Sequence, residues 1–189
     1  MAGVDGYVAD RTPQPARRAR ARLIDEKFKT NKLRYVLQCA LAGVAMAVVL
    51  ILLTPISNAA VIAALGASSF IAFGLPYRAT SRTRFLIGGY VAGVVAGGLC
   101  FWLRSVTPLP AQLGVIPAFP NVVFGAIAVA AATFVMVVTN TEHPPAVGLA
   151  LGFVLLDEWR WITVIAVMAG IVTLCVVKVL LKSVLRDLL

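Results

Sequence analysis

The chain has 189 residues, of which 60% are apolar and 13% charged, and its mean hydropathy is +0.93. A soluble globular domain is about 45–50% apolar and about 25% charged, so this composition excludes an ordinary water-soluble domain and indicates an integral membrane protein. The net charge of +9 is concentrated near the start, since 9 of the 17 Lys and Arg residues precede Tyr35. A basic segment beside apolar segments favours contact with anionic lipid headgroups over nucleic-acid binding.

The first 32 residues are polar and basic, and they lack the apolar run of a secretory signal peptide. We expect residues 1–32 to be a cytoplasmic or interfacial N-terminal segment. They form either a helix lying on anionic headgroups or a solvated tail. Residues 33–189 then form the transmembrane domain.

Charged residues are absent from position 35 to position 77, a run of 43 residues. A helix needs about 20 residues to cross the hydrocarbon core, so this run holds two crossings, and Pro55 separates them. The predicted membrane segments are 33–53, 56–75, 85–103, 121–139, the short segment 144–156, and 161–181. We expect an interruption of the second segment at Gly66–Ser69 and a loop at residues 104–120, which contain four prolines.

Basic residues also occupy the loop with Arg78, Arg82 and Arg84 and the C-terminal tail. The positive-inside rule then places both termini in the cytoplasm and the protein in the cell inner (plasma) membrane. Termini on one side require an even number of crossings. Segment 144–156 therefore completes a sixth passage as a half-length helix joined to non-helical backbone. A re-entrant loop is the alternative.

An internal repeat supports this count. The stretches Ala60–Gly66 and Ala146–Gly152 agree at five of seven positions at an offset of 86, and this offset also carries 33–53 onto 119–139. The predicted fold is an all-α transmembrane bundle of about six crossings, built as two inverted three-helix repeats with discontinuous second and fifth segments. Paired discontinuous helices are a recurrent layout of transporters, with the substrate site where they meet.

The predicted breaks favour an anion site. A half-helix that begins at Pro144 is expected to turn its first N–H groups and its positive dipole end toward a cavity. Residues 54–58 offer a similar terminus from the opposite side. Because non-helical backbone at membrane depth is tolerated mainly around a cavity or inside protein, the two breaks predict a pathway for a small anion.

His143 is the only histidine in the chain, and ionisable groups near membrane depth are costly and often functional. Its ring can hydrogen-bond an anion or carry a proton. Glu142 would repel an anion, so we expect it to be a proton carrier or gate. The alternatives are that His143 satisfies backbone groups near the prolines and that Glu142 lies in the headgroup layer.

Further substrate-binding residues are predicted around these breaks. Together with His143 they are Asn140, Thr141, Pro144, Pro145, Ser57, Asn58, Ser68 and Ser69. Neutral donors bind an ion weakly enough to release it. The alternative is that the polar members only bond helix to helix.

Gly89, Gly93 and Gly97 recur at every fourth position, a spacing that lets helices approach closely either within the chain or between subunits. We expect a homo-oligomer, because few helices are available to shelter polar broken segments. We expect no cofactor, no metal and no enzymatic activity, since one histidine excludes paired-histidine metal motifs and no nucleophile motif accompanies it.

The stretch Thr139–Ala146 contains a His-Pro-Pro signature and resembles the HPP family of integral membrane proteins. Gly66–Ser69, Phe73–Pro76 and the Gly88-Gly89 pair resemble the other pattern of that family, and the similarity covers about residues 33–181. Some relatives are associated with nitrite transport, so the resemblance implies passage of nitrite or a similar monovalent anion.

The chain departs from the family pattern at two places. Val147 interrupts the usual Ala-Gly-Ala run, and Tyr90 stands where a histidine commonly follows the glycine pair. The alternative function is that of a non-transporting membrane scaffold or accessory subunit.

Overall fold

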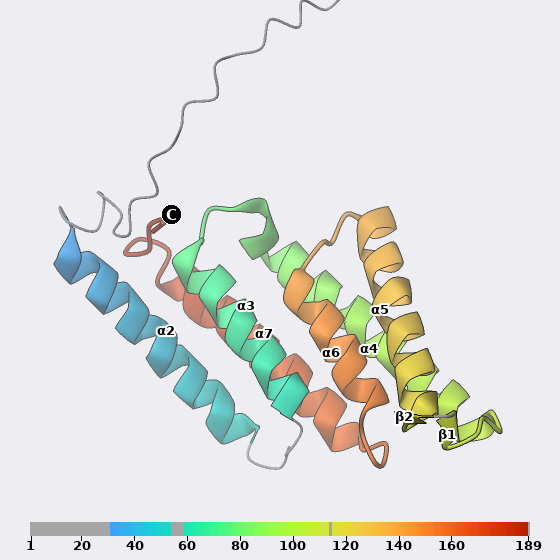
Figure 1. The fold of residues 1–189 in the computed structure, drawn as a ribbon. Coiled ribbons are helices and arrows are strands. Elements are labelled where there is room, and N and C mark those ends of the chain that lie inside the picture. Colours follow the sequence, from blue (N-terminus) through green and yellow to red (C-terminus); the bar gives the residue numbers. More distant parts are fainter. Residues whose placement is uncertain (1–30, 54–58, 114, 189) are drawn as a thin grey trace, which may run out of the picture.

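The computed structural model describes residues 31–53, 59–113 and 115–188, which form a bundle of six α-helices (Figure 1). The helices are α2 (Lys32–Leu52), α3 (Ala59–Gly74), α4 (Thr83–Val106), α5 (Phe119–Thr139), α6 (Pro144–Val154) and α7 (Trp161–Leu180). The 3-10 helix η1 (Ala79–Ser81) precedes α4, and the strands β1 (Gln112–Leu113) and β2 (Ile116–Pro117) pair antiparallel between α4 and α5. Most of the predicted N-terminal segment lies outside the described residues.

Four of these helices, α2, α4, α5 and α7, are long and apolar enough to cross a membrane. The other two are shorter, with 16 residues in α3 and 11 in α6. Large apolar side chains point away from the bundle, among them Phe134, which is 69% exposed, and Ile165, which is 63% exposed. Such a surface suits contact with hydrocarbon rather than water. The fold is that of a multi-pass helical membrane protein.

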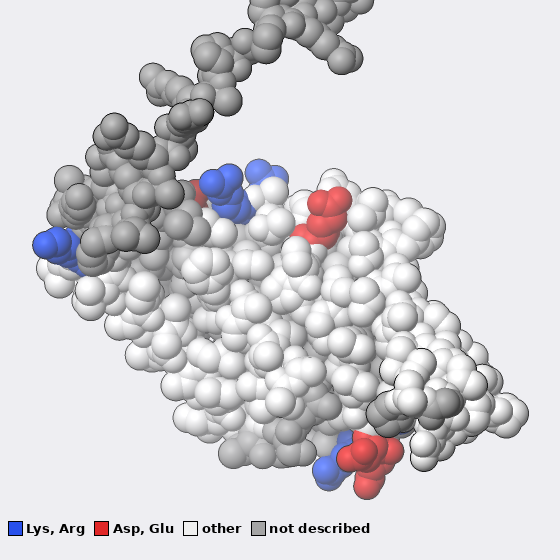
Figure 2. Space-filling view, in the orientation of Figure 1, with Lys and Arg blue, Asp and Glu red and all other residues white. Residues whose placement is uncertain are grey.

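Successive helices run in opposite directions, so α2, α4 and α6 begin at the end of the bundle where α3, α5 and α7 finish (Figure 1). We call this end the basic end. Among the described residues it carries eight basic side chains and two acidic ones, whereas the opposite end carries two of each. On the face drawn in Figure 2, charged side chains lie at these two ends and not between them. The charged residues of the basic end are Lys32, Arg34, Arg78, Arg82, Arg84, Lys178, Lys182, Arg186, Glu142 and Asp187.

The helix contacts fall into two matching groups. α4, α5 and α6 contact one another, and so do α7, α2 and α3, while α3–α6 and α4–α7 contacts join the groups. Exchanging α2 with α5, α3 with α6, and α4 with α7 maps one group of contacts onto the other. For α2 with α5 and for α3 with α6, this is the pairing that the repeat offset of 86 predicts.

The glycines of α4 bring it close to α6. A Cβ atom on Gly93 would lie 2.5 Å from the carbonyl oxygen of Ala146, and one on Gly97 would lie 2.6 Å from that of Ala150. Any side chain at these positions would push the two helices apart. The glycine spacing therefore serves packing within the chain.

The predicted interruption of the second segment at Gly66–Ser69 is wrong, because α3 is helical throughout these residues. The Ser68 hydroxyl lies 2.9 Å from the Ala64 carbonyl oxygen one turn earlier, which keeps its polar group within the helix. The predicted short fifth segment is a helix at Pro144–Val154, and non-helical residues precede it. Residues 104–106, predicted to be loop, belong to the last turn of α4.

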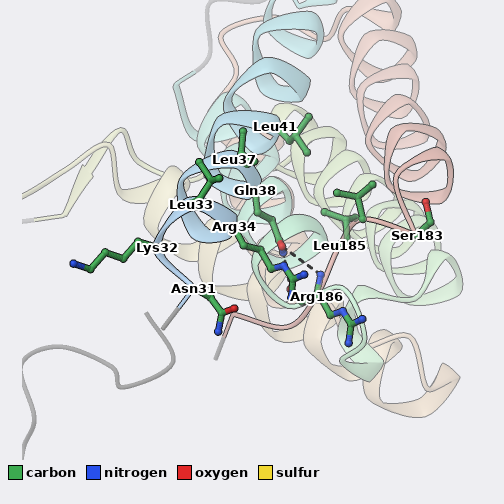
Figure 3. A pocket seen from close by; sticks show the side chains of 11 residues that line it. Asn31, Lys32, Leu33, Arg34, Leu37, Gln38, Leu41, Ser183, Leu185 and Arg186 are labelled. Atoms are coloured by element: carbon green, nitrogen blue, oxygen red, sulfur yellow. Dashed lines mark hydrogen bonds between the residues drawn. The ribbon is translucent and has the colours of Figure 1, made fainter. Parts of the chain in front are cut away.

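The segment 181–188 folds back over the basic end and is hydrogen-bonded to both α2 and α3. The Gln38 side chain, which is 3% exposed, donates hydrogen bonds to the carbonyl oxygens of Phe73 and Arg186. The Tyr35 hydroxyl donates to the Leu188 carbonyl oxygen at 2.6 Å. Beside these bonds lies a cavity of about 490 Å³ between the start of α2 and residues 183–186 (Figure 3).

Candidate functional site

His143 occupies the N-cap position of α6 in an extended conformation, with φ −140° and ψ 91°. A residue before proline is sterically driven to extended backbone, so Pro144 sets this conformation. The side chain is 1% exposed. The only histidine of the chain is therefore held inside the bundle.

Both ring nitrogens of His143 have partners from other elements. Nε2 lies 2.8 Å from the Ser68 hydroxyl of α3, and Nδ1 lies 3.3 Å from the Thr80 carbonyl oxygen of η1. Because a carbonyl oxygen can only accept, Nδ1 carries a hydrogen in this arrangement. In the neutral ring Nε2 is then the acceptor, and the Ser68 hydroxyl donates to it.

Tyr90 of α4 completes the cluster. Its hydroxyl lies 2.8 Å from the Ser68 hydroxyl, its side chain is fully buried, and its ring centroid lies 5.7 Å from that of His143. Gly89 makes room for this packing, since a Cβ atom there would lie 2.6 Å from the His143 Cβ. We call His143, Ser68 and Tyr90 the histidine cluster. It joins α6, α3 and α4 by polar groups inside a bundle whose core is mainly apolar.

The hydroxyl hydrogen of Ser68 has two possible acceptors besides the Tyr90 hydroxyl. The Ser68 hydroxyl is within hydrogen-bonding distance of both His143 Nε2 and the Ala64 carbonyl oxygen. If His143 took up a proton, Nε2 would become a donor and the Ser68 hydrogen would turn to Ala64. The arrangement can thus accept a proton at the ring without leaving a polar atom unpaired.

The 3-10 helix η1 separates the cluster from a cavity at the basic end. Leu75, Arg78, Ala79 and Thr80 line this cavity, which has a volume of about 520 Å³ and is shallow and open to the outside. Thr80 belongs to both environments, because its carbonyl oxygen faces His143. On the other side of η1, Lys178 of α7 donates to the Ser81 carbonyl oxygen and, at 2.8 Å, to the Ser81 hydroxyl. η1 therefore lies between the histidine cluster and this cavity. Hydrogen bonds from His143, at the start of α6, and from Lys178 of α7 hold it in place.

The N-terminus of α6 is less rich in free amides than predicted. Pro144 and Pro145 have no N–H group, and the Ala146 amide donates to the His143 carbonyl oxygen at 2.9 Å. The prediction that this terminus turns its first N–H groups toward a guest is therefore wrong. The two prolines shape the helix start instead.

Of the other predicted site residues, only Ser68 lies in the histidine cluster. Thr141 is nearly buried, and its hydroxyl pairs with that of Thr139 at 2.8 Å. Ser69 donates to the Ala42 carbonyl oxygen of α2 at 3.3 Å, a helix-to-helix bond. Asn140 is exposed with a left-handed backbone, φ 52° and ψ 51°, at the end of α5.

Glu142 is exposed at the basic end, beside the buried His143. Ser57 and Asn58 lie outside the described residues. Among the described residues, no buried side-chain nitrogen or oxygen lacks a hydrogen-bond partner. The histidine cluster is thus fully paired in this structure.

Three contributors were not predicted as site residues: Tyr90, Thr80 and Lys178. The signal for Tyr90 is its position directly after the glycine pair, where the helix must lie close to a neighbour. The signal for Lys178 is a single cation near the end of an apolar segment. Thr80 acts through its backbone carbonyl, so its residue type carries no signal.

These features define a polytopic helical membrane protein with a buried polar cluster between its short helices. Residues 27–187 match the family described as "HPP, transmembrane region", so the chain belongs to the HPP family. Neither the curated proteins nor the solved structures contain a match to this chain.

Proposed function

We propose that this protein conducts a small monovalent anion, such as nitrite, across the membrane, with the histidine cluster at the barrier of the pathway. The observation that carries the proposal is a buried His143 separated only by η1 from a cavity with Arg78 at the basic end. The choice of nitrite as the anion rests on the resemblance to relatives of the HPP family. The geometry supports the coarser description of a small anion.

The charge distribution supports an anion over a cation. In the part of the chain that the structure describes, the basic end carries eight basic and two acidic side chains, and such an excess raises the local anion concentration. Inside the barrier the groups are neutral: an imidazole, a serine and a tyrosine hydroxyl. Neutral groups bind an ion weakly enough to let it leave. Glu142 is exposed at the basic end, which fits the alternative that it lies in the headgroup layer, and its role as a proton carrier or gate stays a prediction.

Opening requires that η1 move away from His143. The Nδ1–Thr80 contact of 3.3 Å is the longer of the two His143 contacts. An anion that accepts the Nδ1 hydrogen would replace the Thr80 carbonyl oxygen without leaving the ring unpaired. The corresponding contacts of the two helix groups support inverted repeats, and rocking of such repeats is a recurrent mode of alternating access.

The same proposal includes six crossings, both termini in the cytoplasm and the plasma membrane as location. The alternating helix directions and the charge excess at the basic end support this topology. Charge-sensitive reporters placed after residue 139 and after residue 156 test it. We expect them on opposite sides, and finding both on one side would make α6 a re-entrant element.

The decisive experiment is anion flux in liposomes that contain the purified protein. We expect nitrite flux above that of empty vesicles and its loss in His143→Ala. Ser68→Ala should reduce the flux several-fold by removing the partner of Nε2. Ser105→Ala is the matched control. The Ser105 hydroxyl bonds the Trp102 carbonyl oxygen within α4, at the end of the bundle opposite the basic end. Nitrate, formate and chloride, each at two pH values, define the selectivity.

A non-transporting scaffold or accessory subunit is the second candidate, and one observation favours it. The histidine cluster is fully paired, as expected of a purely structural polar network. In that case the folded protein in liposomes conducts none of these anions. An enzymatic role is not part of either proposal. Binding of anionic lipid by the N-terminal segment and homo-oligomer formation remain predictions, and native mass spectrometry in mild detergent tests the oligomer.

A further inference from the structure

Two cavities adjoin on the outer side of α4 and α7. The upper cavity, of about 360 Å³, lies at the basic end, and the lower one, of about 270 Å³, extends along the two helices. Thr83 and Val179 line both. The two cavities are therefore neighbours, and together they run from the charged end of the bundle along its membrane-facing side.

The upper cavity is cationic. Arg82, Lys178 and Lys182 line it, and no acidic residue is among the residues that do. The Asp187 carboxylate lies beside this cavity, where it accepts the amide hydrogen of the lining residue Tyr77 at 2.9 Å. The N-terminus of α4, which has no side-chain cap, opens at Thr83 on the same cavity. Cations and the positive end of a helix dipole together favour a phosphate group.

The lower cavity is apolar and open to the surroundings of the bundle. Apart from Thr83, its lining consists of aliphatic side chains and Cys175. Val176 and Val179 are 51% and 60% exposed, so this face lies at the bundle surface rather than in the core. A groove of this kind below a cationic cavity matches the shape of a phospholipid, with a charged headgroup above an acyl chain.

We propose that these two cavities form a binding site for an anionic phospholipid. The headgroup phosphate lies among Arg82, Lys178 and Lys182, and one acyl chain follows the groove between α4 and α7. Basic pockets between transmembrane helices bind anionic headgroups in this way. Since Lys178 also donates to Ser81, a lipid bound here would contact the residue that holds η1. The site depends only on the membrane-protein fold, not on the proposed transport function.

Native mass spectrometry of the purified full chain, with added phosphatidylglycerol or phosphatidylcholine, tests this site. We expect retention of phosphatidylglycerol, and weaker binding by a factor of about 30 in the double variant Arg82→Gln/Lys182→Gln. The matched control is Arg78→Gln/Arg186→Gln, which removes the same charge from the same end but from residues outside both cavities. Both double variants keep Lys178, whose bonds to Ser81 are structural.

A second variant tests the groove without a change of charge. Val176→Trp fills the lower cavity from an exposed position, so we expect the protein to fold and to lose phosphatidylglycerol binding. Inorganic phosphate at the same concentration serves as the probe for a free anion, and we expect it neither to bind nor to displace the lipid. Equal binding of phosphatidylcholine, equal loss in the two double variants, unaltered binding in Val176→Trp, or competition by phosphate alone would each overturn the proposal.

Discussion

The two ends of α6 solve the same problem in different ways. A short helix inside a membrane protein must satisfy its terminal backbone groups without water. At its C-terminus, Arg104 of α4 donates hydrogen bonds to the carbonyl oxygens of Val154 and Leu156 at 2.6 and 2.8 Å. At its N-terminus, Pro144 and Pro145 remove two N–H groups, and no charged side chain caps the helix.

This difference separates a fixed end from an adaptable one. The C-terminus is tied by a permanent cation, which also bonds the Asn121 side chain at 2.7 Å. The N-terminus adjoins the histidine cluster, whose hydrogens can be rearranged between neutral partners. A barrier that must move is better placed at the N-terminus of α6 than at its C-terminus. This difference supports placing the barrier of the proposed pathway at the histidine cluster.

Replacing Arg104 should have the largest effect on stability. Arg104→Met leaves two carbonyl oxygens of the α6 terminus without their donor, at a cost of about 3 kcal/mol. We expect the thermal midpoint in detergent to fall by about 5–10 °C. Arg160→Met, an exposed arginine of the same end, is the control and should change the midpoint little. An equal effect of the two variants would show that the α6 terminus does not depend on Arg104.

Adding a methyl group between α4 and α6 should lower the free energy of unfolding slightly less than Arg104→Met does. Gly93→Ala places a Cβ atom 2.5 Å from the Ala146 carbonyl oxygen, and such overpacking costs about 1–3 kcal/mol. Gly148→Ala is the matched control, because nothing lies within 4 Å of a Cβ atom there. We expect only Gly93→Ala to lower the midpoint. A loss for Gly148→Ala alone would mean that the interface lies on the opposite face of α6.

The histidine cluster should show coupling between its members. Ser68→Ala leaves both His143 Nε2 and the Tyr90 hydroxyl without a partner, at a cost of about 2 kcal/mol, and Tyr90→Phe should cost about 1 kcal/mol. In the double variant we expect less than the sum, because both changes remove the same hydrogen bond. A double-mutant cycle on thermal midpoints measures this. Strict additivity would contradict the cluster.

The smallest effect is expected at the start of α6. Pro145→Ala restores one N–H group at a partly buried position, so we expect destabilisation by about 0.5–1 kcal/mol. Thermal midpoints at matched expression levels detect a change of this size when replicates are averaged. Stabilisation instead would show that the prolines are costly to the fold and point to a role in function.

The existence of the membrane segments was predictable because an uncharged apolar run of membrane length is rare outside transmembrane helices. The ends of α2, α5, α6 and α7 lie within two residues of the predicted ends, which is the usual variation at helix termini. Gly66–Ser69 misled the prediction because glycine and serine are weak helix formers only when no neighbour or i−4 carbonyl supports them. Arg104 was assigned to a loop, since the prolines that follow it mark a boundary without fixing its position.

The site was predictable only in part. His143 stands out as a lone histidine before two prolines, and Ser68 lies in a motif of small and polar residues. Their meeting with Tyr90 depends on how three helices pack, which sequence spacing does not specify. The predicted free amides at Pro144 failed for a chemical reason, since proline has no N–H group to offer.

The closure over the basic end has a consequence for biosynthesis. Gln38 belongs to the first of the described helices, yet the Arg186 carbonyl oxygen that it binds is made 148 residues later. Until then its side-chain amide lacks that acceptor within the bundle. Among the described residues, the first transmembrane helix is thus secured by a segment that is translated after all the other helices.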